Sequence, residues 1–260
     1  MAGVGIERVF VYEGIYDEFL KDAEARVKAL RQGIPTESLG TDANVDCGAM
    51  VMDEQMDLIQ ALVDDALAKG AKLHCGGKRN ASDKCNGGQF YEPTMISGVT
   101  PNMRIFKEEL FGPVMTVIRV PKNSDEECVK MVNDSCFGLG SSVYAGDAER
   151  ALKLGRQFKT GMLTVNDFAS NYLVQSLPFG GCKDSGFGRF AGIEGLQALC
   201  LERSIVTDRI PGVRTSIPPP IDYPIDKQKG LPFCDSLIQL FYNESLVGKV
   251  KGIFGLIKYG

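Results

Sequence analysis

Residues 91–117 read YEPTMISGVTPNMRIFKEELFGPVMTV. The second half of this stretch predicts a turn that leads into a buried strand. Glu108 and Glu109 stand directly before a Phe-Gly-Pro turn, and the β-branched run from Val114 to Val120 follows that turn. An ionised carboxylate at the entrance of a strand can accept hydrogen bonds from both hydroxyls of a ribose. Two solvated acids before a turn are the alternative interpretation.

On either side of this stretch, short β-branched segments alternate with segments whose apolar residues recur every three or four positions. The alternation predicts an α/β fold with a parallel sheet that is covered by helices on both faces. Residues 76–89, rich in glycine and charge, predict a surface loop or a hairpin connection. The expected strands are 8–12, 72–75, 114–120, 142–145 and 162–165, and the expected helices are 16–30, 53–69, 125–133 and 148–158.

A glycine-rich segment, PFGGCKDSGFGR, runs from Pro178 to Arg189. Four glycines within nine residues permit left-handed backbone or close approach of another group. A phosphate-binding loop would need a following Gly-Lys-Ser/Thr and a strand-turn-helix context, and this segment has neither. We therefore expect a structural loop at the rim of a substrate site.

The blocks YEPTMISGVTPNMRIFKEELFGPVMTV, GLGSSVYAGD, GMLTVND and LPFGGCKDSGFGRFAGIEGL resemble successive segments of the aldehyde dehydrogenase superfamily, in that family's order and spacing. The resemblance covers about Gly5 to Ile210 and corresponds to the carboxy-terminal half of the family's catalytic domain, truncated on its amino-terminal side. It implies oxidation of an aldehyde to a carboxylic acid with NAD or NADP. In that reaction a cysteine thiolate attacks the aldehyde, hydride passes to the nicotinamide, and a glutamate activates water.

The resemblance also assigns roles to three residues. Glu109 matches the glutamate that holds the nicotinamide ribose, and Phe111 matches the aromatic residue that lies against the ribose and nicotinamide. Asn166 matches an asparagine that lines the site after the strand MLTV. The alternatives are a core aromatic for Phe111 and a turn former for Asn166.

One departure from the family pattern concerns the nucleophile. The family's Gly-Gln-x-Cys motif places its cysteine five residues before an arginine that matches Arg8, so the matching position is Gly3, which has no nucleophile. The family's general base, oxyanion-hole asparagine and adenosine-binding fold lie upstream of that cysteine. Cys182, beside Lys183, is the one cysteine with a nearby cation and glycine-rich exposure, and we expect it to be a spectator thiol.

Composition excludes several other functions. The formal net charge is -4 and the basic residues are dispersed among acidic ones, which argues against a nucleic-acid partner. Eight cysteines without a Cys-x-x-Cys pair and a single histidine, His74, predict no metal site and a reducing, cytoplasmic location. His74 lies in the apolar segment KLHCGG, where we expect a packed strand residue. No signal peptide or membrane-spanning segment is expected.

The last sixty residues differ in character from the rest. Leu201 to Ile210 predicts a strand, and residues 201–211 are expected to pair with a partner in an oligomer. Residues 212–260 are expected to form a proline-rich arm and an amphipathic tail, broken near Gly248 and Gly252. This tail resembles the branch of the family that carries an extended, proline-rich carboxy terminus. Residues 1–200 are the expected partial catalytic domain.

Three functions follow from these observations. The first is aldehyde oxidation, with the nucleophile and dinucleotide fold supplied by a missing amino-terminal half or a partner chain, in a homo-oligomer. The second is a catalytically inactive truncated paralogue that serves as a fold or oligomerisation module. The third is association of the tail with a membrane surface, because Lys249, Lys251 and Lys258 stand beside apolar residues. Half of a catalytic domain is expected to expose an apolar interface and to oligomerise.

Overall fold

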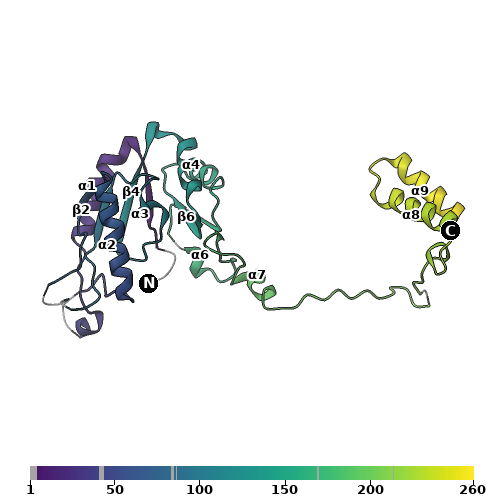
Figure 1. Cartoon of the computed structure of the whole chain (residues 1–260), viewed down its shortest axis with the longest axis horizontal. Coiled ribbons are helices and arrows are strands. Elements are labelled where there is room, and N and C mark those ends of the chain that lie inside the picture. Colours follow the sequence, from purple (N-terminus) through teal and green to yellow (C-terminus); the bar gives the residue numbers. More distant parts are fainter. Residues whose placement is uncertain (1–4, 41–43, 83–84, 86, 169, 213) are drawn as a thin grey trace. The chain divides into compact units, whose positions relative to one another are not determined.

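The structure is a computed structural model that describes residues 5–40, 44–82, 85, 87–168, 170–212 and 214–260. The chain divides into two compact units, Met1–Leu201 and Glu202–Gly260, and each is described by itself. In the first unit (Figure 1), the strands are β1 (Arg8–Tyr12), β2 (Lys72–Cys75), β3 (Thr94–Ser97), β4 (Val114–Val120), β5 (Phe137–Gly138), β6 (Gly140–Val143), β7 (Met162–Val165) and β8 (Cys182–Lys183). Its helices are α1 (Tyr16–Lys28), α2 (Asp53–Ala68), α3 (Arg104–Lys107), α4 (Asp125–Asp134), α5 (Ala148–Gly155), α6 (Ser170–Leu173) and α7 (Gly192–Gln197), with short 3-10 turns at Glu13–Ile15, Pro35–Ser38 and Pro121–Asn123.

The main sheet has the strand order β1-β4-β3-β2. Strand β4 is parallel to both β1 and β3, which confirms the predicted parallel α/β sheet. Strand β2 departs from the prediction because it runs antiparallel to β3. The reason is that the described residues between the two strands form no helix, whereas a parallel return requires a long crossover. The antiparallel pairing fits the hairpin connection that residues 76–89 predict. Two smaller pairs accompany the main sheet: β6 and β7 are parallel, and β5 and β8 are antiparallel.

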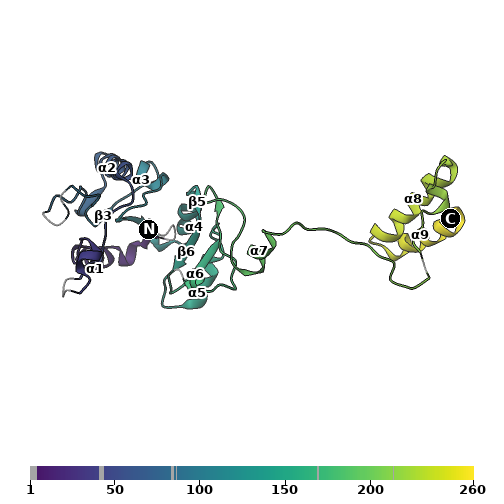
Figure 2. The ribbon, with the colours of Figure 1, turned by 90° about the horizontal axis from the view of Figure 1, so that it is seen from below.

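Helices cover both faces of the main sheet. Successive side chains of a strand point to opposite faces, so Val117 and Ile118 of β4 join different apolar clusters. Ile118 packs in the cluster that includes Ile59 and Leu62 of α2, and Val117 packs in the cluster that includes Val27 of α1. Figure 2 shows α1 and α2 on opposite sides of β3. The expected two-sided covering is therefore present.

A third cluster joins the carboxyl end of the sheet to α4, α5 and the pair β6-β7. Val120 and Cys128 pack with Leu154 in this cluster. Tyr12 is the last residue of β1, and its hydroxyl donates to Asp125 Oδ1 at 2.8 Å. Asp125 also binds the Arg150 guanidinium at 2.8 Å, so one carboxylate connects β1, α4 and α5.

The predicted strand from Leu201 to Ile210 is wrong for this chain. These residues form no helix or strand and are exposed, and none pairs with a strand within the described residues. A β-branched sequence becomes a strand only when another backbone provides hydrogen-bond partners, which a single chain does not offer here. Its pairing in an oligomer, and the domain limits 1–200, 201–211 and 212–260, stay predictions.

The second unit contains a helical hairpin, formed by α8 (Lys227–Tyr242) and α9 (Leu246–Tyr259), after a 3-10 turn at Pro219–Ile221. The predicted breaks at Gly248 and Gly252 are wrong, because α9 runs through both glycines. Gly252 instead permits close helix packing: a Cβ there would lie 2.6 Å from the Leu240 backbone nitrogen and 2.8 Å from the Ser236 carbonyl oxygen. Among the helices formed by described residues, none combines the length and apolar content needed to cross a membrane.

We predict that Ile118→Ala lowers the free energy of unfolding of the first unit by about 2–5 kcal/mol, because it leaves a cavity between β4 and α2. Ile118 is 1% exposed. Urea unfolding monitored by circular dichroism measures the change, and Ile15→Ala, at a position that is 57% exposed, is the matched control. Equal stability of the two variants would contradict the packing described above.

Candidate functional site

The segment that carries Glu109 and Phe111 lies between α3 and β4, where a residue at the entrance of β1 holds it. The Glu7 carboxylate accepts hydrogen bonds from the backbone nitrogens of Leu110 at 3.1 Å and Phe111 at 2.9 Å. The Glu7 carbonyl oxygen also accepts a hydrogen bond from the Thr116 hydroxyl. Because β1 and β4 are parallel neighbours, their entrances meet at the amino edge of the sheet. Glu7 therefore fixes the turn through contacts that reach across about a hundred residues of sequence.

Arg8 secures the same segment from its other end. Its guanidinium donates from Nε to the Phe106 carbonyl oxygen at 2.7 Å and from Nη2 to the Glu108 carbonyl oxygen at 2.9 Å. The guanidinium also lies 5.2 Å from the centre of the Phe137 ring and forms an ion pair with Glu7 at 3.5 Å. Burial lowers the pKa of Arg8, and nearby Glu7 partly opposes that effect. Arg8 thus supplies donors to two carbonyls that the short helix α3 leaves without a helical partner.

Glu109 lies in this braced segment, and no described residue donates a hydrogen bond to its carboxylate. The carboxylate of the neighbouring Glu108, in contrast, is bound by Arg104 at 2.7 Å. Desolvation raises the pKa of Glu109, the negative charge of Glu7 adds to the rise, and Arg8 opposes it. The carboxylate is therefore available to accept donors from a ligand.

Phe111 follows with an unusual backbone conformation. Its φ is 47°, in the left-handed region that residues other than glycine seldom adopt, and the hydrogen bond from its nitrogen to Glu7 holds it there. The side chain is 38% exposed, so the ring is not a core aromatic. A free carboxylate and an accessible ring on one short turn suit a ligand that combines adjacent hydroxyls with a flat ring.

Asn166 directly follows β7, and its side chain is engaged with the backbone of the neighbouring strand. Its Oδ1 accepts from the Ala145 nitrogen at 2.8 Å, and its Nδ2 donates to the Ala145 carbonyl oxygen at 2.9 Å. Its φ of 52° is typical of an asparagine in a turn. These bonds tie the ends of β6 and β7 together, and the site-lining role of Asn166 stays a prediction.

The cation near Cys182 does not activate its thiol. Lys183 Nζ donates to the carbonyl oxygens of Asn133 at 3.0 Å and Ser135 at 2.7 Å. The Cys182 thiol itself donates to the Lys159 carbonyl oxygen at 3.1 Å. This geometry fits the expected spectator thiol. The predicted nucleophile position, Gly3, lies outside the described residues.

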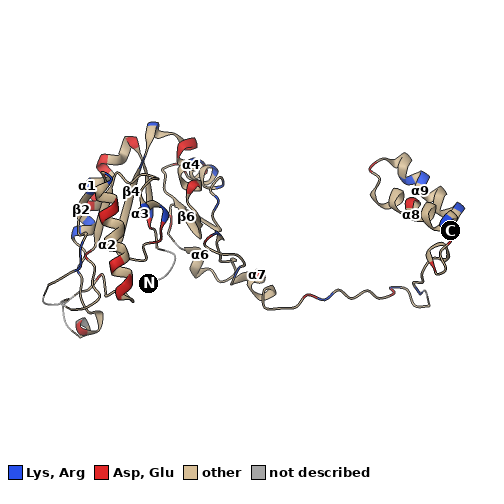
Figure 3. Cartoon of the chain, viewed as in Figure 1, with Lys and Arg blue, Asp and Glu red and all other residues tan. Residues whose placement is uncertain are grey.

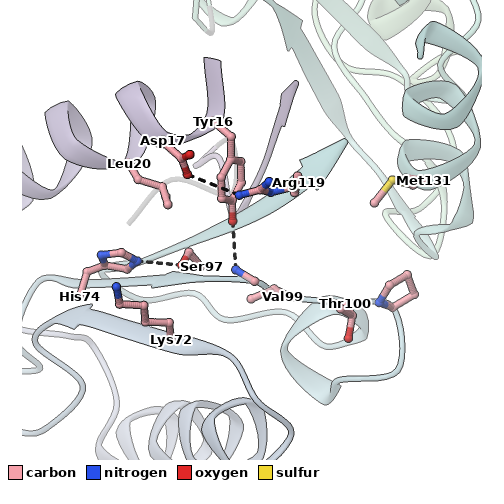
Figure 4. A pocket seen from close by; sticks show the side chains of 12 residues that line it. Tyr16, Asp17, Leu20, Lys72, His74, Ser97, Val99, Thr100, Arg119 and Met131 are labelled. Atoms are coloured by element: carbon pink, nitrogen blue, oxygen red, sulfur yellow. Dashed lines mark hydrogen bonds and ion pairs between the residues drawn. The ribbon is translucent and has the colours of Figure 1, made fainter. Parts of the chain in front are cut away.

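A cavity of about 470 Å³ lies at the opposite edge of the sheet (Figure 4), and no pattern in the sequence predicts it. The Tyr16 hydroxyl accepts from the Gly98 nitrogen at 3.1 Å, and Arg119 lies 4.2 Å from the Tyr16 ring centre. His74 binds Glu24 at 2.9 Å and Ser97 at 2.7 Å, and its side chain is 6% exposed, which confirms the packed strand histidine. Most polar groups of this cavity are thus paired with each other.

The described residues contain no group of three or more histidine, cysteine or acidic side chains arranged to hold a metal ion. All eight cysteines lie among the described residues and are free thiols. Burial raises the pKa of Cys47, Cys75 and Cys128. These three thiols are therefore protonated near neutral pH and pack as small apolar groups.

Comparison with known proteins identifies relatives of the chain. The aldehyde dehydrogenase family matches residues 3–205. An aldehyde dehydrogenase-like protein of Saccharomyces cerevisiae is 42% identical over 258 residues, which cover 98% of this chain and 39% of that protein. The betaine aldehyde dehydrogenase of Bacillus subtilis is 36% identical over 190 residues, which cover 73% of this chain and 37% of that protein.

Solved structures agree with these matches. A variant of the betaine aldehyde dehydrogenase of Staphylococcus aureus, in complex with NAD+, superposes with a TM-score of 0.70 at 33% sequence identity. The superposition covers 81% of this chain and 41% of that one. The chain therefore spans about two fifths of the length of the proteins it matches. The resemblance drawn from the sequence blocks is confirmed, and the assignment to a branch with an extended tail stays a prediction.

We predict that Glu7→Gln lowers the pKa of Glu109, because it removes a negative charge that raises this pKa. The amide keeps one acceptor oxygen, which can serve one of the two backbone nitrogens that the carboxylate binds. A raised pKa means that Glu109 takes up its proton at a higher pH than an ordinary glutamate as the pH falls. Carboxyl-detected NMR titration measures the midpoint, and Glu108, whose pKa Arg104 lowers, is the internal control. An unchanged Glu109 midpoint in Glu7→Gln would contradict this account.

Proposed function

Since this chain belongs to the aldehyde dehydrogenase family, we propose that it forms the part of an aldehyde-oxidising site that holds the ribose and nicotinamide of NAD or NADP. The observation that carries the proposal is that Glu7 and Arg8 hold the backbone of one turn that carries both Glu109, whose carboxylate no described residue binds, and the accessible ring of Phe111. The dinucleotide, when bound, accepts the hydride that leaves the aldehyde carbon.

The residues of this chain would position that group. The Glu109 carboxylate has acceptors for both ribose hydroxyls, and charge-assisted hydrogen bonds of this kind are stronger than neutral ones. The Phe111 ring offers a flat apolar surface on which a planar heterocycle can pack. Because Glu7 and Arg8 order the turn in advance, little conformational entropy is lost when a ligand binds.

Aldehyde oxidation also needs a thiolate and a general base, and we propose that sequence other than these 260 residues supplies them. No Gly-Gln-x-Cys motif occurs in the chain. Cys182, the one cysteine that sequence analysis singled out, donates its thiol proton to a carbonyl oxygen. The substrate is then an aldehyde whose side chain meets surfaces from both parts of the enzyme, and free thiols support a reducing, cytoplasmic location.

A second candidate function is that of an association module without turnover. Large apolar side chains are exposed near the end of the first unit, and such patches on soluble proteins mark contact surfaces. They include Phe187, Ile193, Leu196, Leu199 and Leu201. This observation supports a homo-oligomer or a complex with the remaining part of an enzyme.

We predict that Glu109→Gln weakens binding of nicotinamide mononucleotide to the chain about tenfold, because a neutral amide replaces the ionised acceptor of the ribose hydroxyls. The matched control is Glu108→Gln, next in sequence and bound to Arg104, which should change the affinity less than twofold. NMR titration measures both dissociation constants. Absence of binding to the unmodified chain, or equal losses of affinity in the two variants, would contradict the proposed ribose site.

A kinetic prediction distinguishes Cys182 from a cysteine outside these 260 residues as the nucleophile. The purified chain, mixed with NAD or NADP and short or long aldehydes, should give no increase in absorbance at 340 nm above background, since the chain has no Gly-Gln-x-Cys motif. Cys182→Ala should be indistinguishable from the unmodified chain. A rate that this substitution abolishes would show that Cys182 is the nucleophile.

A further inference from the structure

The hairpin of α8 and α9 buries small residues together with Phe233 and leaves most of its large apolar residues exposed. Ser236 and Gly252 lie at the contact between the two helices, where the backbones approach closely. Phe254 is 68% exposed and Ile257 is 75% exposed. Water-soluble helical hairpins bury such side chains, whereas small residues at helix contacts and large apolar residues outside are typical of helices in lipid.

The polar residues of the hairpin gather on one side. A groove between the helices is lined by Asp235 and Gln239 of α8 and by Lys251 of α9. At 3.6 residues per turn, Ile238 and Ile257 lie on helix faces directed away from this groove. The groove side is therefore hydrophilic, and the outer flanks are apolar. The exposed apolar residues of the two helices are Leu231, Ile238, Phe241, Tyr242, Leu246, Val247, Val250, Ile253, Phe254 and Ile257.

The hairpin also differs from the rest of the chain in charge. Residues 227–260 contain five lysines and two acidic residues, so the hairpin is positive although the whole chain, with 29 basic and 33 acidic residues, is negative. Figure 3 shows basic segments on α9, in contrast to the acidic segments of α2. Lys251 and Lys258 flank the apolar face of α9, where long side chains can bury their methylene groups and keep the ammonium in water.

We propose that residues 227–260 bind the surface of a bilayer that contains anionic phospholipids, with the apolar flanks of both helices among the acyl chains and the Asp235–Lys251 groove facing water. Helices of 16 and 14 residues are about 24 and 21 Å long, shorter than the hydrocarbon core of roughly 30 Å, so the hairpin lies in one leaflet. The lysines outside the groove pair with lipid phosphates, and the exposed aromatic residues sit at the headgroup boundary.

A lipid surface suits the hairpin better than a protein partner. Apart from Val247, which lines the groove, the exposed apolar residues flank the helices on the sides away from it, and a fluid lipid layer covers such a curved surface, which one flat protein face does not. The positive charge is complementary to anionic headgroups, which attract lysine side chains near the surface. Contact between the hairpin and a protein, including a second copy of this chain, is the competing outcome of the test below.

The experiment is cosedimentation of the full chain with phosphatidylcholine vesicles containing about 30% phosphatidylserine. Ile257→Glu should reduce the partition coefficient at least about tenfold, because it places a charge on the face among the acyl chains. Gln239→Glu is the matched control, since it adds the same charge on the groove side, and it should reduce binding less than about fivefold. Circular dichroism checks that both variants keep their helices.

Three results would overturn the proposal. One is the absence of cosedimentation with vesicles of either composition, with or without phosphatidylserine. Another is an equal loss of vesicle binding in Ile257→Glu and Gln239→Glu, which would mean that binding depends on net charge and not on the apolar face. The third is an oligomer that Ile257→Glu converts to a monomer without any vesicle binding, which would assign the apolar flanks to a protein contact.

Discussion

The pair of hydrogen bonds from the backbone nitrogens of Leu110 and Phe111 to the Glu7 carboxylate is the interaction on which the candidate site depends. It joins the entrances of two parallel strands whose sequences lie about a hundred residues apart. The carboxylate satisfies two backbone donors that no helix or sheet accepts, and it holds Phe111 in a left-handed conformation that otherwise costs about 1–3 kcal/mol. Glu109 projects from the same turn, so its position follows from this brace.

The sequence predicted the elements whose cause is local. β-Branched runs became strands, as at Val114–Val120, and three- to four-residue apolar spacing became helices, as at α2. The family blocks assign a cofactor-binding role to Glu109 and Phe111, and that role stays a prediction. The direction of β2 was not predictable from its own residues, because it depends on the connection to β3, and Leu201–Ile210 lacks the partner that makes a strand. The sequence predicts helix breaks near Gly248 and Gly252, whereas in the structure the lack of a side chain at these glycines permits close packing.

The role of Glu7 and Arg8 in holding the turn was not predictable from the sequence for a related reason. Glu7 and Arg8 are an ordinary pair of charged residues in the sequence, and only the parallel pairing of β1 with β4 brings them to the turn at residues 108–113. The engagement of Asn166 with Ala145 likewise depends on the pairing of β6 with β7. The main sheet of the first unit buries its large apolar residues between α1 and α2, whereas the hairpin of the second unit leaves most of its large apolar residues exposed around a contact that includes Ser236 and Gly252.

Amide hydrogen exchange at Leu110 and Phe111 tests the central claim most directly, because the Glu7 side chain is the one acceptor that the described residues offer to both backbone nitrogens. The account predicts measurable protection of both amides in the unmodified chain and its loss at both in Glu7→Ala, while amides in the core of β4, such as that of Val117, keep their protection. Equal exchange at Leu110 and Phe111 in the two proteins would contradict the brace and, with it, the positioning of Glu109.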